Sequence, residues 1–155
     1  MTDWYDDPRL DAVEASVDGW LTSFRTTNPA ILAIDRNEPS EPERRWYVRM
    51  AGEEKEVITI WLTLGQRTLK YETYVLPAPE EQHREVYEYA LRQNAGLVGC
   101  HFCIGGEDAI YLRGELPLAA LDEEELDRVI GTLWVTVERF FRTLLRLAFA
   151  SRFAS

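Results

Sequence analysis

The sequence is poor in the side chains on which most catalytic and metal sites depend. Its 155 residues include only two histidines, His83 and His101, and two cysteines, Cys100 and Cys103. These side chains suggest no Ser–His–Asp or Cys–His arrangement for nucleophilic catalysis. They also do not complete the four ligands of a zinc site. The chain also has no G-x-x-x-x-G-K-[ST] motif that could cradle phosphate. We therefore expect a protein that is not an enzyme, with no catalytic residue, no metal and no cofactor.

Positive charge and long apolar runs are scarce as well. Seventeen basic residues against 27 acidic ones give a formal net charge of -10, which argues against a nucleic-acid partner because phosphate binding relies on clustered Lys and Arg. No apolar run approaches the ~18 residues that a membrane span needs, and the start of the chain lacks the basic and apolar regions of a signal peptide. We expect a cytoplasmic protein with no membrane partner and with reduced cysteines.

What the chain does contain is typical of one globular domain. Hydrophobic residues make up 46% and charged residues 28% of the sequence, which is ordinary globular usage. A chain of this length removes roughly two-thirds of its unfolded surface from water, so that a sizeable core is expected. We predict a single domain over residues 1–155.

The periodic segments indicate an α+β fold, with an antiparallel sheet packed on helices. Asp7 and Pro8 predict an N-cap and a first helical position, and the helix that follows should end near Phe24. Short turns between alternating segments predict an antiparallel meander, and a second helix should follow Pro77 and Pro79. The expected elements are a helix to residue 24, strands at 31–34, 45–50, 57–64 and 69–75, a helix ending near 94, a hairpin over 97–113 and a helix from about 123 to beyond 147.

The last helix carries more apolar surface than a half-buried helix normally does. Asp122 and Glu125 form a variant of the capping box at its start. An inner stripe consists of Leu126, Ile130, Leu133, Val137, Phe140 and Leu144, and a neighbouring stripe of Trp134, Phe141, Leu145 and Ala148. We expect something besides the chain's own sheet to cover the second stripe, and we therefore predict a homodimer.

The stretch GCHFCIGGEDAIYLRG, residues 99–114, contains a C-x-x-C pair and a GGED sequence. Along a strand Cys100 and Cys103 point to opposite sides, so they cannot jointly hold one metal. The core face of this hairpin should contain Val98, Cys100, Phe102, Ile104, Ile110 and Leu112, and the other face His101, Cys103, Tyr111 and Arg113. Diguanylate cyclases carry a GGED hairpin, but Ala109 stands where that family has phenylalanine. We interpret GGED as a turn that uses the positive φ tolerated by glycine.

Over residues 85–150 the sequence resembles the YbjN family, whose members are labelled bacterial sensory transduction regulators. The resemblance lies in the hydrophobic hairpin, the GELPL segment at residues 114–118, the acidic helix start and the long aromatic-rich helix. It implies a fold like that of type III secretion chaperones. Such chaperones are small, acidic, cytoplasmic homodimers that hold extended segments of partner proteins without enzymatic turnover, and the resemblance supplies no catalytic residue.

Three functions stay open from the sequence. The first is a non-enzymatic, dimeric protein-binding or regulatory module that resembles a chaperone. The second is a small-molecule-binding sensor with a pocket between sheet and helices, which an ordered ligand or thermal stabilisation by a metabolite would favour. The third is an enzyme of an unrecognised type, which a cleft with clustered, strongly perturbed carboxylates would favour.

Alternation along the strands also predicts where a partner would bind. It directs Trp46, Val48, Met50, Ile58, Ile60, Leu62, Leu64, Val98, Cys100 and Phe102 toward the helices and leaves Tyr47, Arg49, Trp61, Lys70, Tyr74, Tyr111 and Arg113 on the other side. Aromatic area with arginine is typical of interface hot spots, and a sheet edge can accept a peptide strand. We predict Tyr47, Trp61, Tyr74, Tyr111 and Arg113 as partner-binding residues. The alternative is that cross-strand pairs only stabilise an exposed sheet face.

Overall fold

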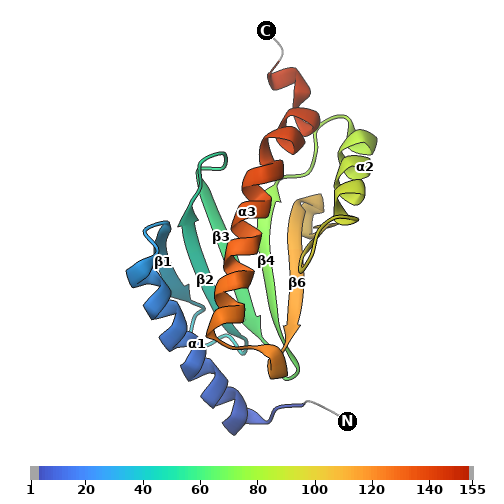
Figure 1. Cartoon of the computed structure of the whole chain (residues 1–155). Helices are drawn as coiled ribbons and strands as arrows, with labels where there is room; N and C mark the ends of the chain where they lie inside the picture. Colours follow the sequence, from blue (N-terminus) through green and yellow to red (C-terminus); the bar gives the residue numbers. More distant parts are fainter. Residues whose placement is uncertain (1–3, 154–155) are drawn as a thin grey trace.

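The computed structural model describes residues 4–153 and shows helices packed against a six-stranded antiparallel sheet (Figure 1). The strand order in the sheet is β1-β2-β3-β4-β6-β5. Helices α1 and α3 lie across one face of the sheet, and α2 packs on α3 and β5. This arrangement confirms the α+β expectation. The elements are α1 (Asp7–Thr27), β1 (Ile31–Arg36), β2 (Arg44–Ala51), β3 (Val57–Leu64), β4 (Thr68–Leu76), α2 (His83–Asn94), β5 (His101–Ile104), β6 (Ile110–Pro117) and α3 (Glu123–Ala148).

The first helix begins and ends at other residues than its sequence signals suggest. The carboxylate of Asp6, not Asp7, accepts the N–H of Arg9 at 3.2 Å and caps the helix, so that Pro8 lies at its second position. The helix continues to Thr27 rather than stopping near Phe24. Its buried residues are Leu10, Val17, Leu21 and Phe24. They share one face, as the helical periodicity predicts.

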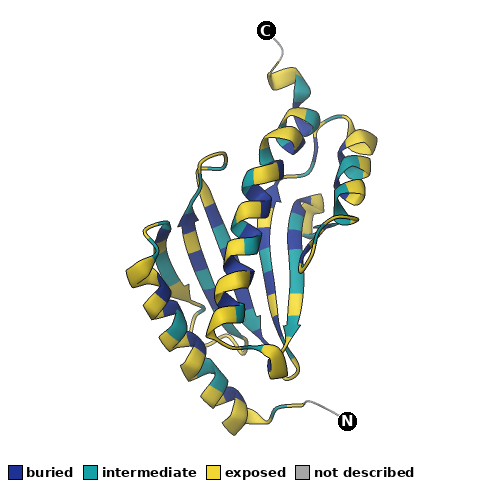
Figure 2. Cartoon of the chain, in the orientation of Figure 1, coloured by how far each residue is buried: buried dark blue, intermediate teal, exposed yellow. Residues whose placement is uncertain are grey.

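The meander strands bury every second side chain, and Figure 2 shows the alternation along them. On β2 and β3 the residues facing α1 and α3 are fully or almost fully buried: Trp46, Val48, Met50, Ile58, Ile60, Leu62 and Leu64. This confirms their predicted direction. Because neighbouring side chains on a strand point oppositely, the residues between them must lie on the face that α1 and α3 leave uncovered.

The long helix α3 is covered mainly by its own chain. All six residues of its inner stripe are buried, and the Asp122 carboxylate accepts the N–H of Glu125 at 2.8 Å as the cap predicted. In the second stripe Trp134 donates its indole N–H to the carbonyl of Ala51 at 2.9 Å, while Phe141 and Leu145 are partly buried against the core. The chain's own residues therefore cover part of this stripe. The homodimer stays a prediction.

The hairpin of β5 and β6 differs from its predicted pattern in two places. Val98 is 79% exposed and Ile104 is 51% exposed, although both were expected in the core. Val98 precedes the four-residue strand β5, where strand alternation does not apply, and Ile104 ends that edge strand. Cys100, Phe102, Ile110 and Leu112 are buried, as predicted.

The GGED turn does not obtain its shape from glycine at positive φ. The left-handed residues are Glu107, with φ of 57°, and Asp108, with φ of 58°. Glycine is needed at Gly105 for another reason, because a Cβ there would lie 2.4 Å from the ring of Tyr111. The turn interpretation holds, but its glycine allows a close approach of backbone to an aromatic ring.

Candidate functional site

The sheet has an open face, which we define as the side turned away from α1 and α3. Strand register places Tyr47 of β2 opposite Trp61 of β3, Trp61 opposite Glu72 of β4, and Glu72 opposite Arg113 of β6. Tyr74 of β4 lies opposite Tyr111 of β6. The structure thus brings all five predicted residues, Tyr47, Trp61, Tyr74, Tyr111 and Arg113, onto this one face. Whether they bind a partner is a separate matter.

The aromatic side chains of the open face form two cross-strand pairs. Tyr47 and Trp61 meet edge to face, with ring centroids 5.9 Å apart and planes at 85°. Tyr74 and Tyr111 do the same at 5.6 Å and 90°. Such pairs contribute about 0.5–1.5 kcal/mol beyond the area they bury. Tyr74 is still 37% exposed, so the face offers aromatic surface that is already held in position.

Arg113 is fixed next to these rings by an ion pair. Its Nε donates to Glu72 at 2.5 Å, and its guanidinium lies 5.0 Å from the ring centroid of Tyr111. Burial by itself lowers the pKa of Arg113, but the hydrogen bond and the charge of the Glu72 carboxylate, with smaller effects of neighbouring groups, together outweigh it and raise that pKa. The guanidinium therefore stays charged on a preformed platform of arginine and tyrosine.

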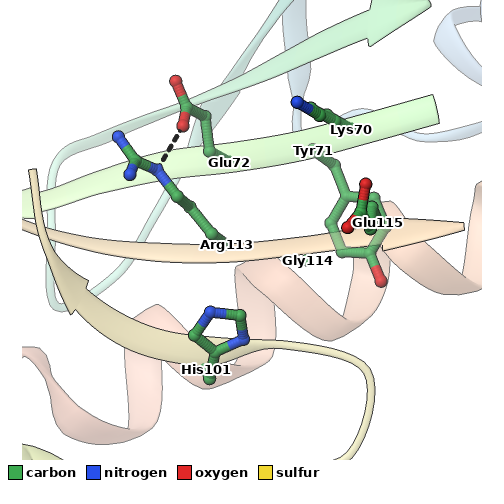
Figure 3. A pocket seen from close by; sticks show the side chains of 7 residues that line it. All are labelled: Lys70, Tyr71, Glu72, His101, Arg113, Gly114 and Glu115. Atoms are coloured by element: carbon green, nitrogen blue, oxygen red, sulfur yellow. Dashed lines mark hydrogen bonds and ion pairs between the residues drawn. The ribbon is translucent and has the colours of Figure 1, made fainter. Parts of the chain in front are cut away.

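A hollow of about 360 Å³ opens beside this platform (Figure 3). Figure 3 shows Glu72 directed toward Arg113, with His101 on the neighbouring strand β5. The carboxylate of Glu72 is engaged by the ion pair with Arg113. The lining residues are Lys70, Tyr71, Glu72, His101, Arg113, Gly114 and Glu115.

The two cysteines lie in different surroundings, as predicted. Cys100 is buried, with its Sγ 3.9 Å from the hydroxyl of Thr136 on α3, whereas Cys103 is half-buried beside Arg113. Burial raises the pKa of both thiols, the opposite of what an activated cysteine requires. Within residues 4–153 no group of three histidine, cysteine or acidic side chains could hold a metal ion.

An apolar patch between α2 and β5 was missed by the sequence reasoning. Its most exposed members are Leu91 (69%) and Ile104 (51%). We call these two residues the α2–β5 patch. Both line an apolar groove of about 320 Å³, together with Tyr87, Ala90, Phe102, Cys103 and Ile110. The sequence signal for this patch was the low apolar content of α2. The buried residues of this helix are Val86 and Ala90, and Leu91 lies outside their face.

The outer edge of β5 is partly occupied by a side chain. The amide of Asn94, at the end of α2, donates to the carbonyl of Phe102 at 3.1 Å and accepts the Phe102 N–H at 2.7 Å. Asn94 thus takes the backbone groups that a neighbouring strand would use. This contact disfavours addition of a peptide strand at the β5 edge of the sheet.

Similar proteins are known from bacteria. Rv0487 of Mycobacterium tuberculosis (strain H37Rv) is 36% identical over 104 residues, which cover 67% of this chain and 57% of the relative. ML2442 of Mycobacterium leprae is 35% identical over 107 residues, which cover 69% of this chain and 58% of the relative. The match thus spans less than two thirds of the length of these relatives.

Solved structures share the fold at low sequence identity. One is a chain of the heterodimeric complex ExoU–SpcU from the type III secretion system of Pseudomonas aeruginosa, with a TM-score of 0.57, 14% identity, and coverage of 86% of this chain and 98% of that one. Another is a chain of the ExsC–ExsE complex, with a TM-score of 0.59, 17% identity, and coverage of 84% and 95%. The fold is therefore that of type III secretion chaperone complexes, as the resemblance implied.

Within residues 4–153 no helix is long and apolar enough to cross a membrane.

The family match extends beyond the stretch that the sequence motifs pointed to. The profile of the YbjN family, described as "Putative bacterial sensory transduction regulator", matches residues 12–146 and so includes most of α1 and the whole meander. This chain belongs to the YbjN family.

Proposed function

We propose that this chain is a non-enzymatic binding or regulatory module of the cytoplasm that holds a segment of a protein partner on the open face of its sheet. The observation that carries the proposal is the composition of that face, where two aromatic pairs and Arg113 lie on the side that α1 and α3 leave uncovered. Aromatic and arginine side chains dominate the binding energy of protein interfaces. The solved structures described above share this fold and are complexes of two different proteins, which also supports a protein partner.

Preorganisation favours binding at this face. The edge-to-face contacts of Tyr47 with Trp61 and of Tyr74 with Tyr111 already restrict their side chains. A partner that docks on them therefore immobilises few additional rotamers, and this lowers the entropic cost of association.

The double variant Trp61→Ala with Tyr111→Ala tests the proposal. It removes one member of each aromatic pair, and hot-spot residues contribute about 2 kcal/mol or more each, so affinity for a true partner should fall at least tenfold. Proteins captured from a lysate of the native host are identified with the wild-type chain, and the affinity of each is then measured for both chains. The matched control is Val135→Ala, an exposed apolar residue on α3.

The melting temperature of each variant must be measured alongside the affinities. A folded double variant that binds every partner as tightly as the wild type would exclude the open face as the site. Equal losses in the double variant and the Val135→Ala control would exclude it as well.

We further propose that the chain forms a homodimer through the α2–β5 patch. Adjacent exposed apolar residues are uncommon on monomeric proteins, and a twofold contact would bury Leu91, Ile104 and the groove they line from both copies. Light scattering after gel filtration should give twice the chain mass for the wild type and for Val135→Glu. Ile104→Glu, which adds the same charge within the patch, should give a monomer.

The groove at this patch also fits the small-molecule alternative. Its volume of about 320 Å³ lies at the lower end of the range for ligand pockets, and its lining is apolar. A sensor would be favoured over a dimer if the wild-type chain is monomeric and an apolar metabolite raises its melting temperature. The metabolite should then have no such effect on Ala90→Trp, which fills the groove.

A further inference from the structure

The open face differs in charge from the rest of the molecule. The strands of this face carry four basic side chains, Arg45, Arg49, Lys70 and Arg113, against the three acidic ones of Asp35, Glu72 and Glu115. The whole chain has a formal net charge of -10. The open face is thus a nearly neutral, slightly basic surface on a strongly acidic protein.

Two of these four cations have no carboxylate of their own. Arg49 pairs with Asp35 at 3.6 Å and Arg113 with Glu72 at 2.5 Å. Within residues 4–153, neither Arg45 nor Lys70 lies within 4.0 Å of any carboxylate oxygen. The Nε of Arg45 instead donates to the hydroxyl of Thr63 at 3.0 Å.

These unpaired cations lie on one row across the sheet. Register places Arg45 of β2 opposite Thr63 of β3, and Thr63 opposite Lys70 of β4. Arg45 and Lys70 are therefore two strand spacings apart, roughly 10 Å between backbones, with only the small Thr63 side chain between them. Trp61 lies on the same face of β3, two residues or about 7 Å along the strand.

The acidic residue closest to this row is turned to another neighbour. Glu115 of β6 lies opposite Lys70 of β4 in the register, but its carboxylate accepts a hydrogen bond from the hydroxyl of Thr68 at 3.0 Å. It lies on the far side of Lys70 from Arg45. The space over Thr63 is consequently flanked by two positive groups and by the indole of Trp61.

We propose that the partner segment held on the open face is acidic, and that a carboxylate of this segment binds between Arg45 and Lys70 while a neighbouring aromatic side chain packs on Trp61. This inference rests on the proposed function and adds the chemistry of the partner to it. A short acidic segment can place one carboxylate between Arg45 and Lys70 and keep the rest of its chain over the nearly neutral open face, whereas a nucleic acid carries a negative charge at every phosphate and would be repelled by the acidic remainder of the molecule.

Synthetic polymers test this site without a known partner. The probe is a fluorescently labelled random copolymer of glutamate and tyrosine, with a copolymer of lysine and tyrosine and with polyuridylate as comparisons. We expect the glutamate–tyrosine copolymer to bind most tightly. Raising the ionic strength from about 0.1 M to about 1 M shortens the screening length from ~10 Å to ~3 Å and should weaken this binding severalfold.

Charge-neutralising variants locate the site. Arg45→Gln and Lys70→Gln should each weaken binding of the glutamate–tyrosine copolymer about two- to fivefold, as expected for one exposed ion pair, and the double variant roughly tenfold. Lys70 makes no side-chain hydrogen bond in the described chain, so that Lys70→Gln does not remove an internal contact. Arg45→Lys, which keeps the charge, should restore most of the binding lost in Arg45→Gln.

The control is Arg146→Gln, which changes the net charge equally on an exposed residue of α3 that has no carboxylate within 4.0 Å among residues 4–153. Equal losses in Lys70→Gln and Arg146→Gln would overturn the proposal, as would tighter binding of polyuridylate or of the lysine–tyrosine copolymer. If the Trp61→Ala, Tyr111→Ala variant loses its protein partners while Lys70→Gln keeps them, the proposed function holds and the acidic segment is excluded. If the double aromatic variant keeps all partners, the proposed function itself fails.

Discussion

Gly114 of β6 supports both the core and the open face, and replacing it with alanine should destabilise the protein. A Cβ at this position would lie 2.4 Å from the carbonyl oxygen of Gly99 and 2.5 Å from a ring carbon of Tyr71. Uncrowded carbon contacts lie at about 3.5–4.0 Å. The Tyr71 ring or the chain at Gly99 must therefore move by about 1 Å.

The magnitude follows from two contributions. Overpacking of a well-packed core costs about 1–3 kcal/mol. The same movement would disrupt the hydrogen bond from the Tyr71 hydroxyl to the Gly99 carbonyl, now 2.5 Å long, at a cost of about 1 kcal/mol. We expect a total of about 2–4 kcal/mol, which for a chain of this length lowers the melting temperature by roughly 5–15 °C.

The assay is urea and thermal unfolding of Gly114→Ala beside a matched glycine variant. Gly131, within α3, would place its Cβ in open space, with no atom within 4 Å. Gly131→Ala should therefore stabilise the protein by up to about 1 kcal/mol, since alanine is the better helix former. Tyr71→Phe, which removes only the hydroxyl, should cost about 1 kcal/mol.

The opposite signs of the two glycine variants are the decisive result. If Gly114→Ala unfolds at the wild-type urea concentration, β6 does not lie against Tyr71 and Gly99 in the way described. A Gly114→Ala variant no less stable than Tyr71→Phe would show that the clash relaxes freely and that only the hydrogen bond is lost.

Two further predictions concern titratable groups. Burial by itself raises the pKa of Glu14, but the hydrogen bonds and the positive charges of Arg44 and Arg36 together outweigh it and lower that pKa from 4.5. Because the folded-state pKa is the lower one, the stability it contributes is complete above pH ~4.5 and is lost as the pH falls through the folded value. Glu14→Gln should flatten the decline of the urea midpoint in acid, and an unchanged decline would contradict this. Burial raises the pKa of the Cys100 and Cys103 thiols, so iodoacetamide should alkylate both more slowly than glutathione at pH 7.5, and a faster thiol would refute the assigned environments.

Much of the fold follows from local rules in the sequence. The strand 57–64 has the predicted bounds, and the neighbouring strands differ from prediction by one or two residues at their ends. Alternation on β2, β3 and β4 assigns each side chain to the correct face, because one buried face fixes the register of a strand. Alternation therefore predicts the residues of the open face from the sequence alone. The prediction left out Arg45, although the same alternation places it on this face.

Local rules fail where tertiary packing decides. Ile104 is as apolar as Ile110, yet only Ile110 is buried. The difference is that β6 lies between β4 and β5 in the sheet while β5 is an edge strand of four residues. Nothing in the local pattern shows which hairpin strand will be central.

The same strand register determines which residues form the core and which form the open face, so stability and binding are linked. On β6, Leu112 and Gly114 face the helices while Tyr111 and Arg113 face outward. A shift of one residue would send Arg113 into the core, so every contact that fixes this register also fixes the partner-binding surface. Gly114 is such a contact on the buried side, and Gly105, whose missing side chain admits the Tyr111 ring, is one on the open side. Variants at these glycines should therefore weaken partner binding without touching the partner, whereas Lys70→Gln should weaken it without changing stability. Measuring both quantities for each variant separates residues that form the surface from residues that hold it in place.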